Sequence, residues 1–125
     1  MKHIHFDVKS DGFYGAYWEC KGGSDCTVIA MLGDDPEDYM ARSAVKWLLR
    51  LGVNVLTMSP AKKDYSHHNY PLECIEKAIA WLKSHSSTKI GIAGASTTGT
   101  LALTAASIFD DISLTVAMTP SDFVW

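Results

Sequence analysis

The chain has 125 residues, of which 47% are hydrophobic, and a formal net charge of −3 at pH 7. This length suits one domain, residues 1–125, with a sizeable core, and the small acidic charge argues against a nucleic-acid partner. No apolar run reaches the roughly 18 residues of a membrane span, and the N-terminus lacks a signal-peptide pattern. Three cysteines without a Cys-x-x-Cys pair favour reduced thiols in a cytoplasmic protein, with no metal site and no cofactor.

The beginning of the chain predicts an antiparallel hairpin. Residues 3–8 alternate apolar and polar side chains, as in a strand buried on one face. Asp11-Gly12 is a turn pair, and residues 13–19 continue as a second strand. His3 and His5 share the polar face of the first strand, where we expect solvated side chains rather than metal ligands.

Residues 26–32 form a nearly unbroken apolar run, which is typical of a central strand buried on both faces. A helix is predicted over 36–51, with Asp35 as its cap and Pro36 in its first turn, and Gly52 ends it. Residues 53–58 follow as the next strand. The helix is expected to bury one apolar face, made of Met40, Ala44, Trp47, Leu48 and Leu51.

Residues 59–70 are the longest segment without periodicity, and loops of this length are often functional. Adjacent histidines point in different directions, which favours a surface or substrate-rim role for His67 and His68 over a metal site, and Tyr65 is a further candidate for the substrate rim. A helix is predicted over 71–84. Its inward face is expected to contain Leu72, Ile75, Ile79 and Leu82.

The stretch after this helix predicts a strand over 89–94, a tight turn around Ser96, a helix over 97–107 and a last strand over 112–118. Gly94 and Gly99 shape the turn, which is a partial Gly-x-Ser-x-Gly motif because Thr98 stands where its second glycine falls. Two other interpretations are a helix N-cap at Ser96 and a phosphate loop. The phosphate loop is disfavoured because residue 100 is threonine instead of lysine.

The alternation of strands and helices predicts an α/β fold, with a mostly parallel sheet, helices on both faces and an antiparallel start. The serine turn then follows the fifth strand, as in the α/β-hydrolase superfamily, which the chain resembles. The segments 94–99 and 118–125 are similar to the C-terminal domain of acyl-CoA thioesterases and bile-acid-CoA:amino-acid acyltransferases, and to dienelactone-hydrolase-like enzymes.

The resemblance implies a serine hydrolase that acts on an ester or thioester through an acyl-enzyme on Ser96. It also implies an oxyanion hole made by the backbone N–H of Thr97 and by the loop at Gly33 and Asp34. The expected partner is a small ester or thioester, such as a short acyl-CoA, and not a membrane.

The hydrolase triad runs in the order Ser, acid, His, but no histidine follows Ser96. We therefore expect residues 1–125 to be the N-terminal portion of a longer hydrolase, inactive alone, with the acid and the histidine beyond residue 125. The strand 112–118 would then be an unpaired sheet edge through which copies of the chain associate. The alternative is a non-catalytic, flavodoxin-like ligand-binding or regulatory domain, with its ligand at the carboxyl ends of the strands.

Overall fold

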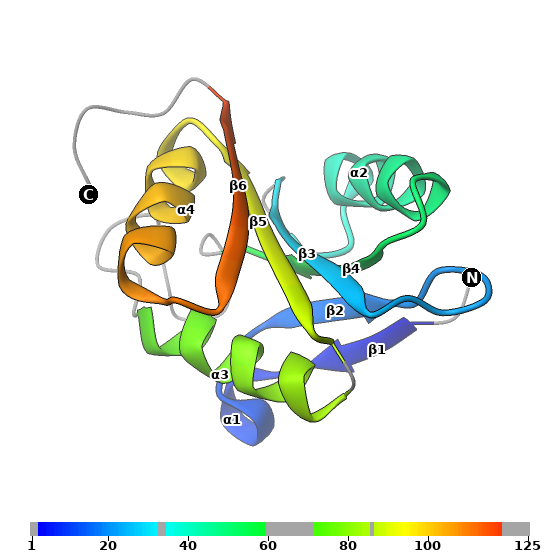
Figure 1. Cartoon of the computed structure of the whole chain (residues 1–125), viewed down its shortest axis with the longest axis horizontal. Helices are drawn as coiled ribbons and strands as arrows, with labels where there is room; N and C mark the ends of the chain where they lie inside the picture. Colours follow the sequence, from blue (N-terminus) through cyan, green and yellow to red (C-terminus); the bar gives the residue numbers. More distant parts are fainter. Residues whose placement is uncertain (1–2, 33–34, 60–71, 86, 119–125) are drawn as a thin grey trace.

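Six strands form one mixed sheet in the order β1-β2-β4-β3-β5-β6 (Figure 1). The computed structural model describes residues 3–32, 35–59, 72–85 and 87–118. The strands are β1 (His3–Phe6), β2 (Gly15–Trp18), β3 (Cys26–Met31), β4 (Asn54–Met58), β5 (Lys89–Ala95) and β6 (Ile112–Met118). The helices are α1 (Val8–Asp11), α2 (Tyr39–Arg50), α3 (Leu72–Ser84) and α4 (Thr97–Ile108).

The pairing of the strands confirms the predicted sheet. β1 pairs with β2 and β2 with β4 in antiparallel fashion. β3 is parallel to both β4 and β5, and β5 is parallel to β6. The strand that precedes Ser96 is therefore central, beside β3. A flavodoxin-like sheet is parallel throughout, so the antiparallel pairing of β2 with β4 argues against the flavodoxin-like alternative.

The connection between β1 and β2 differs from the predicted tight hairpin. β1 ends at Phe6, and the short helix α1 occupies Val8–Asp11. The side chain of Asp7 accepts a hydrogen bond from the backbone N–H of Lys9 at 2.8 Å, and Gly12 ends the helix in the left-handed region with φ of 86°. The prediction of a strand through residue 8 was wrong because a local side-chain cap and a glycine stop favour one helical turn there.

Helix α2 begins three residues later than predicted. Its cap is Asp38, whose side chain accepts from the backbone N–H of Ala41 at 2.9 Å. Asp35 instead accepts from the N–H of Glu37 at 2.9 Å, in the turn that precedes the helix. The prediction of Asp35 as cap was wrong because the cap is the acid that reaches the third N–H of the helix, and composition does not distinguish the two.

The buried face of α2 was also predicted only in part. Its buried side chains are Ala41, Val45 and Leu48. The other large apolar side chains of the predicted face are each more than half exposed: Met40 (61%), Trp47 (62%) and Leu51 (62%). The helix carries two neighbouring apolar stripes, and the sheet covers only one of them.

The handedness of the connections explains which helix lies on which face. α2 leads from β3 to β4 in one direction across the sheet, whereas α3 and α4 lead to β5 and β6 in the other direction. Right-handed crossovers in opposite directions place their helices on opposite faces. Figure 1 shows α2 on one side of the sheet and α3 and α4 on the other.

The main core lies beneath α3 and α4. The predicted inward residues of α3 are confirmed, since Ile75, Ile79 and Leu82 are buried and Leu72 packs against the core from its edge. The smaller core beneath α2 consists of Ala16, Trp18, Ala30, Val45, Leu48 and Val55. None of the helices in the described ranges is long and apolar enough to cross a membrane.

On the α2 side, β5 and β6 have no helix above them among the described elements. An apolar groove of about 340 Å³ follows these two strands beside α2. Its walls include Val28, Trp47, Ala93, Leu114, Val116 and Met118. The sheet is therefore covered on one face and partly bare on the other.

Candidate functional site

Ser96 lies in a strained turn between the end of β5 and the start of α4. Its backbone angles are φ 55° and ψ −121°, and it is the one non-glycine residue with positive φ in the described ranges. Residues other than glycine rarely adopt these backbone angles. The conformation costs on the order of 1–3 kcal/mol and persists only where the surrounding structure enforces it. A serine in a tight turn between a strand and a helix is the geometry predicted from the partial motif.

Gly94 and Thr98 explain how the chain makes this turn. A Cβ at Gly94 would overlap the backbone carbonyl of Thr98 and lie 2.9 Å from the backbone nitrogen of Gly99. The first motif glycine is therefore required by the close approach of α4 to β5. Thr98, in place of the second glycine, is buried, and its hydroxyl donates to the carbonyl of Ala95 at 2.7 Å and accepts from the N–H of Ala95 at 2.9 Å.

The side chain of Ser96 is exposed and makes no capping hydrogen bond. The N-cap interpretation is therefore wrong for its hydroxyl. The backbone of Ser96 is held firmly: its N–H donates to the carbonyl of Met118 at 2.9 Å, and its carbonyl accepts from the N–H of Thr100 at 3.1 Å. The turn fixes the residue and leaves its hydroxyl accessible to a reactant.

The surroundings of Ser96 favour negative charge. Thr97 is the first residue of α4, and the first N–H groups of a helix have no partner within it. The positive end of the helix dipole points toward the turn. Met31 at the end of β3 pairs with Gly94, so the chain leaves β3 beside this turn. The next predicted donors, Gly33 and Asp34, lie outside the described residues, as do the rim candidates Tyr65, His67 and His68.

The described histidines lie far from Ser96. His3 and His5 are on β1, four strand positions from β5 and thus about 19 Å away at the usual strand spacing. His85 comes before β5, at the opposite end of that strand, and stacks on Trp81 with 4.4 Å between ring centroids. A general base for Ser96 is therefore not among them.

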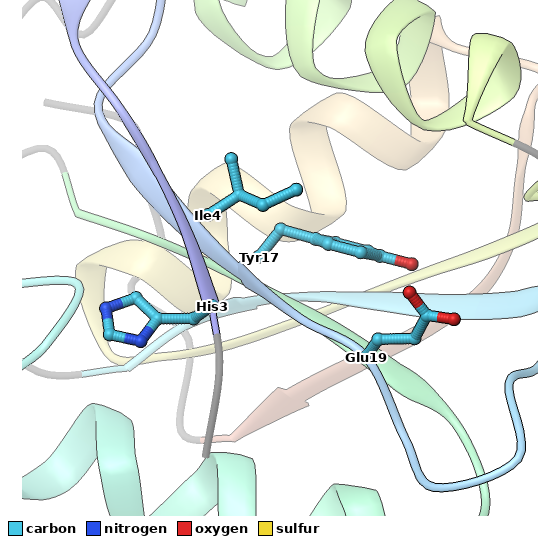
Figure 2. A pocket seen from close by; sticks show the side chains of 4 residues that line it. All are labelled: His3, Ile4, Tyr17 and Glu19. Atoms are coloured by element: carbon cyan, nitrogen blue, oxygen red, sulfur yellow. The ribbon is translucent and has the colours of Figure 1, made fainter.

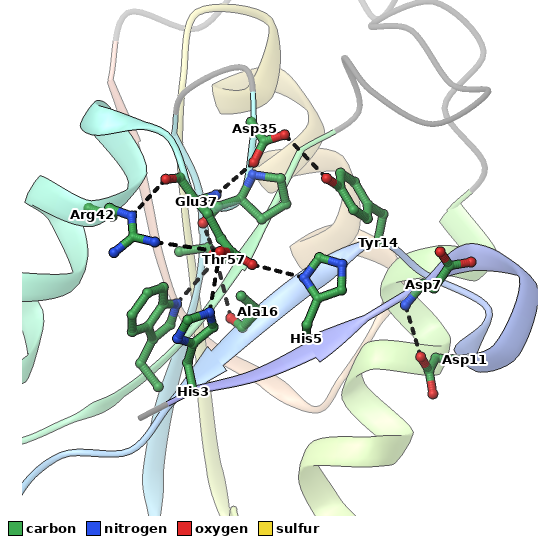
Figure 3. Close-up of polar contacts among 12 residues, drawn as sticks. His3, His5, Asp7, Asp11, Tyr14, Ala16, Asp35, Glu37, Arg42 and Thr57 are labelled. Atoms are coloured by element: carbon green, nitrogen blue, oxygen red, sulfur yellow. Dashed lines mark hydrogen bonds and ion pairs between the residues drawn. The ribbon is translucent and has the colours of Figure 1, made fainter. Parts of the chain in front are cut away.

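A polar cluster around Glu37, which the sequence analysis did not predict, connects β1 with the β3–α2 connection. Figure 3 shows His3 and His5 pointing toward Glu37. The carboxylate oxygens of Glu37 lie 2.9 Å from His5 Nδ1, 3.3 Å from His3 Nε2 and 3.5 Å from Arg42 Nη2. The two histidines are paired side chains rather than merely solvated ones. The described residues contain no group of three metal-binding side chains.

Tyr14 fixes the same connection from the neighbouring side. Its hydroxyl donates to the carboxylate of Asp35 at 3.2 Å. Burial raises the pKa of Tyr14, and the negative charge of Asp35 raises it further, so the hydroxyl keeps its proton and remains a donor. Spacing alone could not have revealed these contacts, because nothing in the sequence pairs β1 with residues 35–37.

A hollow of about 290 Å³ at the β1–β2 edge is lined by His3, Ile4, Tyr17 and Glu19 (Figure 2). Figure 2 shows His3 pointing away from Tyr17 and Glu19. Burial raises the pKa of Tyr17, and the nearby Glu19 adds to this effect. Polar groups that do not converge on one point make a poor ligand site, so the turn at Ser96 is the better candidate.

Solved structures with similar folds identify the architecture. The α/β hydrolase GrgF from Penicillium sp. sh18 has a TM-score of 0.72 at 17% identity, and the match covers 95% of this chain and 45% of that one. Est1E from Butyrivibrio proteoclasticus has a TM-score of 0.71 at 21% identity, covering 96% of this chain and 51% of that one. An esterase from Pyrococcus furiosus has a TM-score of 0.70 at 24% identity, covering 95% and 48%.

The chain has the fold of an α/β hydrolase, and it spans about half the length of these three structures. Residues 70–125 match the family described as BAAT / Acyl-CoA thioester hydrolase C terminal. The predicted resemblance to the thioesterase and acyltransferase domain is thereby confirmed over that stretch. No curated protein matches the sequence.

Proposed function

We propose that Ser96 is the nucleophile of a serine hydrolase that cleaves esters or thioesters. The observation that carries this proposal is the strained backbone of Ser96, with φ of 55°, combined with an exposed hydroxyl that caps nothing. Strain of this kind is concentrated at functional sites. A serine that served only the helix would adopt extended backbone angles and use its hydroxyl as a cap.

In the proposed reaction, the Ser96 oxygen attacks the carbonyl carbon of the substrate while a general base takes the hydroxyl proton. The carbonyl oxygen becomes an oxyanion, which the N–H of Thr97 and the positive end of α4 stabilise. The alcohol or thiol then leaves with the proton, and water hydrolyses the acyl-enzyme. The base and its acid partner come from residues outside the described ranges. Gly33 and Asp34 remain the predicted second part of the oxyanion hole.

The match of residues 70–125 to a thioester hydrolase domain supports the proposed substrate class. A small thioester, such as a short acyl-CoA, is the proposed substrate, and a small carboxylic ester is the simplest surrogate. Proteins of this fold catalyse many reactions, so the assignment depends on the serine site and not on the fold.

The test uses the protein from the complete reading frame and its Ser96→Ala variant. Turnover of acetyl-CoA and of p-nitrophenyl acetate is measured together with labelling by a fluorophosphonate probe. We expect the variant to lose labelling and at least 10³-fold in kcat, as for loss of a nucleophile. The matched control is Ser107→Ala on the exposed side of α4, which should keep both. Equal turnover by wild type and Ser96→Ala would refute the proposal.

A second variant separates a strained nucleophile from a structural residue. Glycine adopts positive φ without strain, so Ser96→Gly should raise the free energy of unfolding by about 1 kcal/mol while abolishing turnover. Urea unfolding followed by circular dichroism measures the change. A loss of stability in Ser96→Gly would instead indicate that the serine side chain supports the fold.

A further inference from the structure

The backbone angles of Ser96 are defined by the two peptide groups on either side of it. A peptide group is planar, so φ and ψ of a residue depend on how its two neighbouring planes are turned relative to each other. The first plane contains the carbonyl of Ala95 and the N–H of Ser96. The second plane contains the carbonyl of Ser96 and the N–H of Thr97, which is the proposed oxyanion donor. The contacts that hold these two planes therefore hold the strained φ of 55°.

Hydrogen bonds hold both planes. In the first plane, the carbonyl of Ala95 accepts from the hydroxyl of Thr98 at 2.7 Å. At its other end, the N–H of Ser96 donates to the carbonyl of Met118 at 2.9 Å. In the second plane, the carbonyl of Ser96 accepts from the N–H of Thr100 at 3.1 Å, and the hydroxyl of Thr100 adds a longer contact of 3.5 Å. The first plane is thus fixed at both ends, and one of its two partners is a side chain.

The hydroxyl of Thr98 is itself firmly placed. Thr98 is buried on α4, and the same hydroxyl accepts from the N–H of Ala95 at 2.9 Å. Its one proton therefore points to the carbonyl of Ala95 while its oxygen receives the N–H of that residue. Turning the hydroxyl away would break both contacts at once, so Thr98 is a rigid support for the residue that precedes Ser96.

We propose that Thr98 is a positioning residue for Ser96, which it serves by fastening Ala95 and so keeping the serine in its strained conformation. This inference rests on the proposed function. Thr98 does not touch the reactant. Its hydroxyl makes contacts that a glycine at this motif position could not make. Without them the peptide between Ala95 and Ser96 can turn toward a relaxed φ, which moves the serine oxygen from its place at the end of β5.

The test is Thr98→Val in the complete protein, which keeps the shape of the side chain and removes its hydroxyl. A displacement of about 1 Å in a catalytic group can cost about 100-fold in rate. Because Met118 and Thr100 still hold Ser96, we expect kcat/KM for p-nitrophenyl acetate and the rate of fluorophosphonate labelling each to fall about tenfold, after correction for the folded fraction. Unchanged rates in Thr98→Val would overturn the inference.

Two further variants separate positioning from packing. Thr98→Ser keeps the hydroxyl and loses the methyl group, and it should stay within about twofold of wild type. If packing alone mattered, the order would be reversed, with Thr98→Ser impaired and Thr98→Val normal. The matched control is Thr104→Val further along α4, which removes a similar bond from a hydroxyl to the carbonyl of Thr100 at 2.9 Å and should leave both rates unchanged.

A stability measurement tests the strain without using activity. Ser96→Gly relieves the strain and should raise the urea midpoint of unfolding. In the Thr98→Val background the same change should raise the midpoint by less than about half as much, because the strain is already partly released. Equal shifts in both backgrounds would overturn the inference. If Ser96→Ala were fully active, the proposed function itself would fail; if Ser96→Ala is inactive and Thr98→Val is normal, only this inference fails.

Discussion

The two faces of the sheet bury their apolar side chains to different extents, although the strands are similarly apolar on both. Beneath α3 and α4, the side chains of Ile90, Ile92 and Ile112 are buried. On the α2 side, Leu114 is 63% exposed and Val116 47% exposed, although both are apolar residues of β6, the same strand that contributes the buried Ile112. Burial is therefore decided by which helices lie above a strand, and not by how apolar the strand is.

The largest expected effect comes from the covered face. Ile75 on α3 is fully buried, and Ile75→Ala should lower the free energy of unfolding by about 2–5 kcal/mol through lost transfer energy and a cavity. Leu114→Ala on the bare face should change it by less than about 0.5 kcal/mol, as is usual for exposed sites. Urea unfolding of this chain measures both. Equal losses would show that the groove is closed in solution.

An intermediate effect is expected from a charge in the groove. Val116→Lys places an ammonium group on the exposed apolar strip, where the side chain can reach water. Fluorescence of the apolar dye ANS should fall several-fold, and the expected self-association along the β6 edge should weaken in sedimentation velocity runs, since charged edges resist pairing. The control for the dye reading is Ser113→Lys on the same strand, because Ser113 does not line the groove. Unchanged dye fluorescence in Val116→Lys would argue that the dye binds elsewhere.

The smallest expected effect concerns the three cysteine thiols, which differ in whether they lie in the buried interior or at the apolar groove. Cys20 and Cys74 are buried, whereas Cys26 is half-buried and lines the groove. One thiol should therefore react with Ellman's reagent in the native chain and three after unfolding. Burial raises the pKa of the Cys26 thiol above its ordinary value of 9.0, and Asp25 adds to this. The thiolate fraction at pH 7 is lowered accordingly, so the labelling rate should keep rising beyond pH 9. A Cys26→Ser variant should show no fast thiol.

Local rules were sufficient for most of the elements and for the serine turn. The period of the apolar residues placed β3 to β6 and α3 within one or two residues, and Gly94 with Ser96 identified a sharp strand-to-helix turn. These features depend on neighbours along the chain, through side-chain alternation and backbone sterics. Even here the cap of α2 was predicted at Asp35 and is observed at Asp38, because both acids satisfy the same local rule.

Only the tertiary structure decided which apolar stripe of α2 faces the sheet. It also brought Glu37 into contact with two histidines that lie 32 and 34 residues away in the sequence. Such contacts arise from the order of strands in the sheet, which brings β1 and the β3–α2 connection together. The sequence by itself determined a mostly parallel sheet with a serine at the end of its fifth strand. The strain at Ser96, its unused hydroxyl and the bare strip beside α2 depend on packing between distant segments, which a linear pattern does not record.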